Sequence, residues 1–325
     1  MPSMESIPES ASRFLARQIE RLRRMPRPKK IVFPEGEDPR VEAAAAKLTR
    51  EGLIEPILLC GEEEAPQYAE LYYERRRSRG VTRREAEAIA RRPLYRAALM
   101  VAAGDADGAV GGAVNTTAET ARAALHAIGT ARHVRTVSGV FFMCVRDRAF
   151  GADGVLAFAD AALLPDPSAF EVAEIAIASA HSLRAMTGAE PRIALLSFST
   201  RGSAEHPSID KMVEALRILR ERAPELHADG ELQADAALVA SVAARKAPGS
   251  AVAGRANTLI FPDLSSANLA YKLVERLGGA VAFGPFLQGL AKPFNDLSRG
   301  SSEEEIFGAG IITALQSEGI AIASL

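Results

Sequence analysis

A serine and an arginine stand side by side near the end of the chain, in the segment AKPFNDLSRGSSEEE from Ala291 to Glu305. The Ser298 hydroxyl can hydrogen-bond a thiol or an oxyanion. The Arg299 guanidinium can hold a phosphate or a carbonyl oxygen through two parallel donors, a geometry that lysine cannot supply. The pair therefore predicts chemistry on an acyl or phosphoryl group, at a turn that precedes an acidic helix.

A glycine-rich loop from Gly111 to Thr117 is a second candidate for anion binding. Glycines let the backbone approach a ligand closely, and Thr116 with the free amides of the following helix would face the same point. The partial positive charge of the helix N-terminus favours phosphate there, and Arg122 lies within two turns of it. The alternative is that Thr116 only caps the helix and that Arg122 is solvated.

A third polar loop follows the apolar run before Phe198. It offers hydroxyls and amides that could cradle a phosphate or an acyl phosphate, at Ser199, Thr200, Gly202 and Ser203. The order GxxxxGK[ST] of a nucleotide P-loop is missing, which disfavours ATP. The five histidines are scattered without the spacing of a zinc site, so no metal is expected.

Composition excludes some classes of partner. The formal net charge is −2, and glutamates interrupt the basic tract between Tyr72 and Arg92, so we expect no binding to nucleic acid. No apolar window is long enough to span a bilayer, and the N-terminus has no apolar segment after a basic one. Cys60 and Cys144 are expected to be buried and reduced. These features predict a cytoplasmic protein without a membrane partner.

Short apolar runs alternate with amphipathic patterns, which predicts an α/β fold with parallel β-α-β units. Four helix starts carry a capping box, at Thr82, Thr116, Ser168 and Ser302. Asp38 followed by Pro39 starts another helix. Strands are expected at 31–33, 54–59, 108–110, 136–145, 193–198, 258–261 and 280–283.

The run from Gly230 to Leu273, followed by Gly284, Pro285, Gln288 and Gly289 and by the DLSRG segment, resembles the phosphate acetyltransferases of the phosphate acetyl/butyryltransferase family. The resemblance extends from about residue 30 to residue 316. It implies two three-layer α/β/α domains of mostly parallel sheets with a cleft between them, as in isocitrate and isopropylmalate dehydrogenases. Residues 1–132 with 287–325 would form the first domain and 133–286 the second, in a homodimer.

The resemblance also implies roles for single residues. Ser298 would hydrogen-bond the thiol of coenzyme A and Arg299 would stabilise the carbonyl oxygen or the phosphate. Glu305 would be the base, although the family usually has aspartate there and Glu305 also completes the capping box of Ser302. Arg76, matched by the pattern YELRxxxG within a one-residue slip, and Arg122 would bind coenzyme A or phosphate; Asn115 stands where many members have histidine.

The implied reaction is reversible acetyl transfer, in which acetyl-CoA and phosphate exchange with acetyl phosphate and coenzyme A in a ternary complex. Coenzyme A is then a substrate, and no permanently bound cofactor is expected. Two alternatives stay open, a phosphate butyryltransferase and a coenzyme A- or phosphate-binding regulatory module that has lost turnover. A dehydrogenase is disfavoured because no GxGxxG follows a strand.

Overall fold

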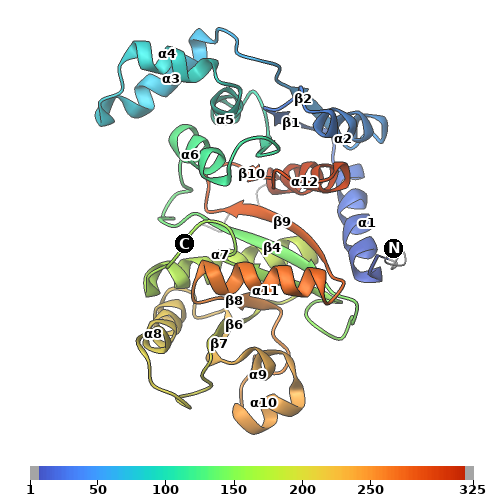
Figure 1. Ribbon diagram of the computed structural model, residues 1–325, viewed down its shortest axis with the longest axis vertical. Coiled ribbons are helices and arrows are strands. Elements are labelled where there is room, and N and C mark those ends of the chain that lie inside the picture. Colours follow the sequence, from blue (N-terminus) through green and yellow to red (C-terminus); the bar gives the residue numbers. More distant parts are fainter. Residues whose placement is uncertain (1–6, 319–325) are drawn as a thin grey trace. The chain divides into compact units, whose positions relative to one another are not determined.

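The computed structural model describes residues 7–318, which form two compact units (Figure 1). The first unit holds residues 7–16 and Val134–Gly284. The second unit holds Arg17–His133 and residues 285–318. The fold is α/β with mostly parallel strands, as the alternation of apolar runs and amphipathic patterns predicts.

The sheet of the second unit has four parallel strands in the order β10-β3-β1-β2. The strands are β1 Lys29–Phe33, β2 Ile54–Leu58, β3 Gly108–Gly111 and β10 Phe294–Asp296. Helix α2 (Pro39–Arg50) connects β1 to β2, which confirms the predicted β-α-β unit. Asp38 caps α2 by accepting a hydrogen bond from the Arg40 amide at 2.9 Å.

Helices cover both faces of this sheet. Helices α2 and α12 (Glu303–Gln316) pack against each other and against β2, whereas α5 (Pro93–Ala103) contacts β3 and α6 (Thr117–Ala127) contacts β10. Successive side chains of a strand point to opposite faces. Phe33 accordingly lies near α12, while Val32 joins the apolar cluster of α5 and α6. The remaining helices of this unit are α3 Pro66–Arg76, the 3-10 turn η1 Arg77–Arg79 and α4 Arg83–Arg91.

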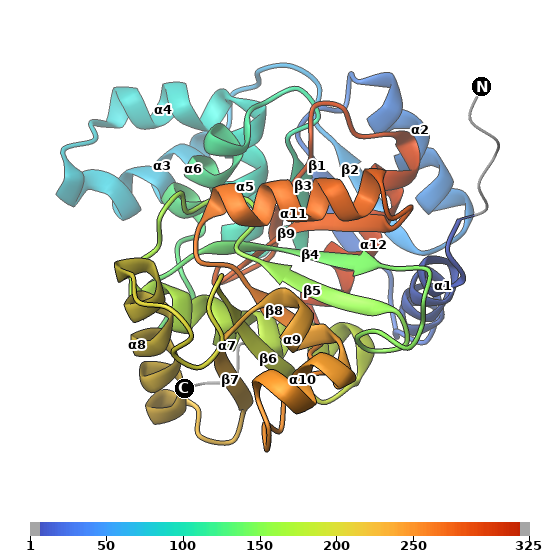
Figure 2. The same cartoon turned by 60° about the horizontal axis from the view of Figure 1, so that its bottom comes forward.

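The sheet of the first unit has six strands in the order β7-β6-β8-β5-β4-β9 (Figure 2). Strands β4 and β5 pair antiparallel, and the pairs β5 with β8, β8 with β6 and β6 with β7 are parallel. The strands are β4 Ser138–Cys144, β5 Val155–Ala159, β6 Arg192–Leu196, β7 His227–Leu232, β8 Thr258–Ile260 and β9 Val281–Gln288. The helices are α1 Glu9–Arg23, which begins in this unit, α7 Ala169–Thr187, α8 Pro207–Arg222, α9 Ala234–Leu238, α10 Ala240–Lys246 and α11 Leu264–Arg276.

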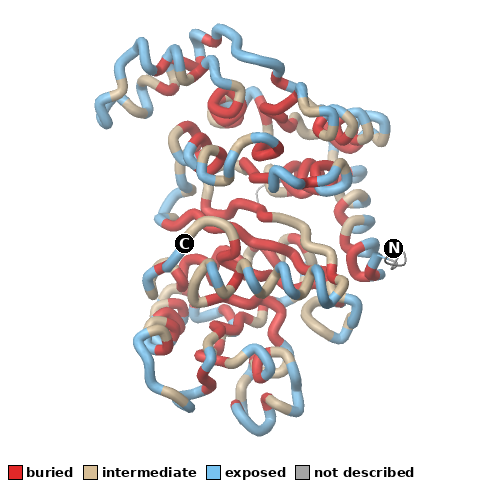
Figure 3. The backbone as a smooth tube through the Cα atoms, viewed as in Figure 1, coloured by how far each residue is buried: buried red, intermediate tan, exposed pale blue. Residues whose placement is uncertain are grey.

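The strands of this six-stranded sheet are largely buried (Figure 3). Every residue of β4 and β5 is buried, and α7 is buried over most of its length against β4, β5, β6 and β8. A helix that is apolar on all sides belongs in such a core. On the opposite face, the ring of Phe141 stacks on that of Tyr271 from α11, with the centroids 4.3 Å apart.

Short-range predictions agree well with this structure. All four predicted capping boxes are present, and all seven predicted strands exist, although β9 is longer than predicted and β4 starts later. Strands β5, β7 and β10 were not predicted from the sequence. Cys144 is buried, but Cys60 is exposed in the loop after β2, so its predicted burial is wrong; both are free. No helix within residues 7–318 is long and apolar enough to cross a membrane.

Candidate active site

A pocket of about 510 Å³ opens in the second unit where β1, β2 and β3 end. Parallel α/β sheets bind their ligands beyond this edge. The turn after β1 supplies residues 34–39, the loop after β2 supplies Leu59 and Gly61, and the start of α5 supplies Arg92. The glycine-rich loop supplies Val114 and Asn115, so one of the predicted site residues lines the pocket.

The carboxylate of Glu35, which also lines the pocket, organises the glycine-rich loop. Its Oε1 accepts hydrogen bonds from the amides of Gly112, Val114 and Asn115 at 3.1, 3.1 and 3.0 Å. Its Oε2 accepts one from the Ala113 amide at 2.7 Å, and the Asn115 side chain donates to Oε1 at 2.7 Å. These amides are therefore bonded to the protein's own carboxylate, whereas the sequence analysis expected the loop to offer its backbone to a ligand.

Thr116 caps α6, as its position in the sequence predicts. Its hydroxyl accepts a hydrogen bond from the Glu119 amide at 3.3 Å, and the Glu119 carboxylate accepts one from the Thr116 amide at 2.9 Å. The hydrogen bond from the Thr116 backbone lowers the pKa of Glu119, and the positive charges of Arg92 and Arg122 act in the same direction. The start of α6 thus lies in the field of two arginines, of which Arg92 was not identified from the sequence.

The Arg40 guanidinium joins three segments of the second unit. It donates to the carbonyl oxygens of Arg299 and Ser301, both at 2.9 Å, and to that of Ala113 at 3.0 Å. It also pairs with Asp38 at 2.7 Å, and the hydrogen bond from Arg40 lowers the pKa of that carboxyl. Arg40 therefore fixes the glycine-rich loop and the Ser298–Arg299 segment to the start of α2.

Ser298, Arg299 and Gly300 are exposed, in contrast to Ser301, which is buried. The Ser298 hydroxyl accepts a hydrogen bond from the Gly300 amide at 3.2 Å. The Arg299 side chain makes no hydrogen bond or ion pair with the described residues, so its five donors face no protein acceptor there. A fork of free donors beside a hydroxyl can bind a phosphate or a carbonyl oxygen.

Glu305 lies at the start of α12, where its carboxylate serves as a cap. It accepts a hydrogen bond from the Ser302 amide at 2.6 Å, and its own amide donates to the Ser302 hydroxyl at 3.2 Å. The capping role that the sequence offered for Glu305 is confirmed. Its role as a base stays a prediction.

Asp296 is a carboxyl group that the sequence analysis did not single out. It ends β10 opposite Gly111 of β3, is 2% exposed, and accepts a hydrogen bond from the Thr117 hydroxyl at 2.6 Å. Burial raises the pKa of Asp296 to about 6; the hydrogen bonds from Thr117 and Thr120 oppose this rise, and the nearby Glu35 carboxylate adds to it. A carboxyl group two residues before Ser298 can therefore change its charge near neutral pH.

Arg76 and Arg122 lie around one histidine. The guanidinium of Arg76 lies 3.4 Å from Nε2 of His126, and the Tyr72 hydroxyl lies 3.3 Å from its Nδ1. Burial, and then the charges of Arg76 and Arg122, lower the pKa of His126, so the neutral ring can accept from Arg76. Arg75 instead donates to the Ile128 carbonyl at 3.1 Å, and the structure thus distinguishes these two neighbouring arginines.

The polar loop predicted at residues 199–203 of the first unit is hydrogen-bonded to the carboxylate of Glu231. The Ser199 hydroxyl and the Gly202 amide donate to Oε1 of Glu231 at 2.8 and 2.7 Å. The Ser203 hydroxyl accepts from the Thr200 amide at 3.0 Å, and Ser199 and Thr200 are buried. These four residues are brought together, but their donors are largely engaged within the loop. Glu231 is thus the counterpart of Glu35, and neither glutamate has a local sequence signal.

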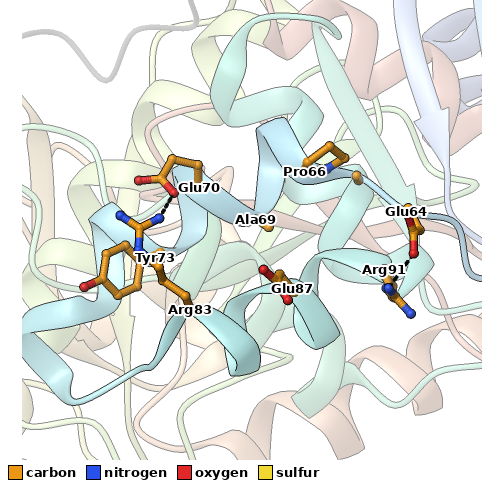
Figure 4. A pocket seen from close by; sticks show the side chains of 9 residues that line it. Glu64, Pro66, Ala69, Glu70, Tyr73, Arg83, Glu87 and Arg91 are labelled. Atoms are coloured by element: carbon orange, nitrogen blue, oxygen red, sulfur yellow. Dashed lines mark hydrogen bonds and ion pairs between the residues drawn. The ribbon is translucent and has the colours of Figure 1, made fainter.

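A second pocket, of about 410 Å³, lies between α3 and α4 and is lined by none of the predicted site residues (Figure 4). Arg83 pairs with Glu70 and lies over the Tyr73 ring at 4.4 Å, and Arg91 pairs with Glu64 at 2.7 Å. Each of these two arginines is thus paired with a glutamate, and a third glutamate, Glu87, also lines the pocket. Within residues 7–318 no group of three or more histidine, cysteine or acidic side chains could hold a metal ion.

Comparisons with known proteins give a consistent family. The family model described as phosphate acetyl/butaryl transferase matches residues 14–314. A phosphate acetyltransferase of Paracoccus denitrificans is 48% identical over 301 residues, which cover 89% of this chain and 95% of that protein. One from Acetivibrio thermocellus is 43% identical over 313 residues, with 89% and 94% covered. The crystal structure of a phosphotransacetylase from Streptococcus pyogenes superposes with a TM-score of 0.87 at 42% identity, and covers 94% of this chain and 98% of its own.

Proposed function

Because this chain belongs to the phosphate acetyl/butaryl transferase family, we propose that it is a phosphate acetyltransferase, an acyltransferase that exchanges acetyl-CoA and phosphate with acetyl phosphate and coenzyme A. The observation that carries the proposal is the exposed Ser298–Arg299 pair, which Arg40 ties to the glycine-rich loop. The Ser298 hydroxyl lies next to the Arg299 guanidinium, which has no partner within residues 7–318. Such a pair suits a reaction in which charge develops on a carbonyl oxygen and on phosphate.

The reaction needs no group beyond the two substrates and the side chains. The thiol of coenzyme A loses its proton, its sulfur forms a bond to the carbonyl carbon, and the bond from that carbon to the phosphate oxygen breaks. Phosphate leaves with the bonding electron pair and takes up the proton. Coenzyme A is therefore a substrate, and we propose no permanently bound cofactor and no metal.

Three residues of the second unit are proposed to act on the reacting atoms. Ser298 donates a hydrogen bond to the thiolate or the oxyanion, and Arg299 holds the acyl phosphate through paired donors. Glu305 is the proposed base. Its Oε2 accepts the hydrogen bond from the Ser302 amide at 2.6 Å, and its Oε1 can take up the proton.

The other predicted residues are proposed to bind substrate. The positive charges of Arg76 and Arg122 around His126 suit the phosphates of coenzyme A, and Asn115 and Thr116 stand at the pocket and at the start of α6. In the first unit, Ser199, Thr200, Gly202 and Ser203 would bind phosphate only if Glu231 gives up its donors, because two of them are now bonded to it.

Acyl chain length is tested by supplying purified protein with coenzyme A and, in turn, acetyl, propionyl or butyryl phosphate. A value of kcat/KM that is highest for acetyl phosphate supports the proposal. A preference for butyryl phosphate would make the chain a phosphate butyryltransferase. Binding of coenzyme A in calorimetry without turnover of any acyl phosphate would make it a regulatory module.

We also propose that the protein is a cytoplasmic homodimer. Three leucines of α11 and its end are exposed on one face, Leu269 by 62%, Leu273 by 55% and Leu277 by 82%. Their spacing of four residues forms a continuous apolar stripe, which is unusual on a free surface. Light scattering should give twice the mass of 34.5 kDa, and a value of one chain mass would refute the dimer. The two free cysteines suit a reducing compartment.

A further inference from the structure

The carboxyl group of Asp296 lies where three segments of the active site meet. It ends β10 and pairs in register with Gly111, the residue that opens the glycine-rich loop. Its Oδ2 accepts the Thr117 hydroxyl at 2.6 Å, at the first residue of α6. Ser298 follows two residues later in the chain. The Asp296 side chain thus contacts the start of α6, and its residue lies next to the first residue of the glycine-rich loop and two residues before the Ser298–Arg299 segment.

The other oxygen of this carboxyl group, Oδ1, is buried and has no hydrogen-bond partner among the described residues. It faces Gly112, whose φ is +104°; a Cβ built on that glycine would lie 2.4 Å from Oδ1 and 2.7 Å from the Leu297 amide nitrogen. A buried carboxyl oxygen without a donor is costly to keep ionised. A group held at this cost beside the Ser298–Arg299 segment is a candidate for a role in turnover.

Burial raises the pKa of Asp296, and groups on the turn after β1, on α6 and in the backbone of Leu297 modify that rise. Glu35 lies on the turn after β1 and binds the amides of the same glycine-rich loop, so its negative charge opposes the ionisation of Asp296. The hydroxyls of Thr117 and Thr120, from α6, favour ionisation. Arg40 is a cation of the same network, because it donates a hydrogen bond to the carbonyl of Ala113 in this loop. The balance leaves the carboxyl group able to gain or lose a proton under ordinary conditions.

We propose that Asp296 is a positioning residue for the transfer reaction, whose ionised carboxylate holds the start of α6, the glycine-rich loop and the Ser298–Arg299 segment in the arrangement that turns over substrate. This inference rests on the proposed function. The ionised carboxylate carries no proton, so both lone pairs of its Oδ2 are available to accept the hydrogen bond from the Thr117 hydroxyl. A proton on the carboxyl group turns one oxygen into a donor that faces Gly112. This proton lowers the cost of burying the group and so stabilises the fold, but it removes the negative charge that holds the Thr117 hydroxyl, and turnover falls.

The test is the dependence of kcat/KM on pH in the wild-type protein and three variants. Wild type should lose activity with an apparent pKa near 6 as the pH falls. Asp296→Asn should lower kcat about 10-fold or more at neutral pH and abolish this acid limb. Thr117→Val removes a hydrogen-bond donor to the carboxylate, so it should raise the apparent pKa of this acid limb by about half a pH unit. Glu305→Gln, although slow, should keep the limb where it is in wild type.

Two results would overturn the inference. If kcat/KM of Asp296→Asn still falls at acid pH, the titrating group is a substrate or another residue. If the apparent pKa of this fall is the same in Thr117→Val as in wild type, Asp296 does not set it. A readout without substrate separates this inference from the proposed function. The urea midpoint of wild type should fall more between pH 5 and pH 7.5 than that of Asp296→Asn; equal shifts would refute the titration of Asp296 whether or not the protein transfers acetyl groups.

Discussion

Replacing Arg40 by glutamine tests how the Ser298–Arg299 segment is held in place. The guanidinium donates to three backbone carbonyls, at 2.9, 2.9 and 3.0 Å, and pairs with Asp38. The side chain is 34% exposed, so each charged hydrogen bond is worth less than in a core, about 1 kcal/mol. The variant should therefore lower the free energy of unfolding by about 3 kcal/mol, with little change from the partly exposed ion pair.

The same substitution should also slow the reaction. If the Ser298–Arg299 segment moves by about 1 Å, kcat should fall by about 10²-fold, because the guanidinium of Arg299 no longer meets the acyl phosphate correctly. Urea unfolding and steady-state kinetics measure the two effects separately. Arg50→Gln is the matched control, because Arg50 lies on the exposed end of the same helix, and it should change neither quantity.

Arg40→Lys refines the result, since lysine can satisfy one carbonyl but not the whole fork. Its kcat should lie between those of wild type and Arg40→Gln. A glutamine variant that loses stability but keeps the wild-type kcat would refute the positioning of the catalytic segment and leave Arg40 as a purely stabilising residue.

Three further predictions concern the same loops. Gly112→Ala should destabilise the protein by about 3 kcal/mol or more in urea unfolding, because the new Cβ would clash with the Leu297 backbone and the Asp296 carboxyl. The control is Gly129→Ala, since Gly129 also has a positive φ, +82°, but no atom lies within 4 Å of its new Cβ; it should cost only about 1 kcal/mol. Glu305→Gln should lower kcat by about 10²-fold yet keep the melting temperature, since glutamine also completes a capping box; an unchanged kcat would assign it to the cap alone. Folding raises the pKa of Asp296 from 3.8 to about 6, so the group stabilises the protein below pH 3.8, and this stability, about 3 kcal/mol, is lost as pH rises through 6. Asp296→Asn should remove this dependence of the free energy of unfolding on pH, measured by urea titration. An unchanged dependence would contradict the prediction.

Local signals in the sequence predicted local structure well. A capping box needs only two residues three apart, and all four of those predicted are present, including Thr116 and Ser302 at the active site. Strands β1 and β4 are runs of apolar residues buried on both faces, which is the pattern of a central strand. Strand β7, with the sequence HADGEL, has no such run, and β10 has three residues, so both escaped prediction.

Long-range contacts explain what the sequence could not predict. Glu35 binds amides 77 to 80 residues away, and Arg40 binds carbonyls more than 250 residues further along the chain. No spacing rule connects such positions. The glycines and hydroxyls of two loops predicted phosphate binding, but Glu35 and Glu231 accept hydrogen bonds from the amides of these loops. A carboxylate and a phosphate can use the same amide donors, so the sequence pattern does not distinguish them.

The most direct test of the central claim is the initial rate of acetyl-CoA formation from acetyl phosphate and coenzyme A, measured for wild type, Arg299→Lys and the exposed control Arg50→Lys. We expect rapid thioester formation by wild type and the control, and a rate about 10²-fold lower for Arg299→Lys, since one ammonium group cannot replace paired donors. An Arg299→Lys variant as fast as wild type would contradict the proposed site, and a wild-type protein that forms no thioester would contradict the proposed function.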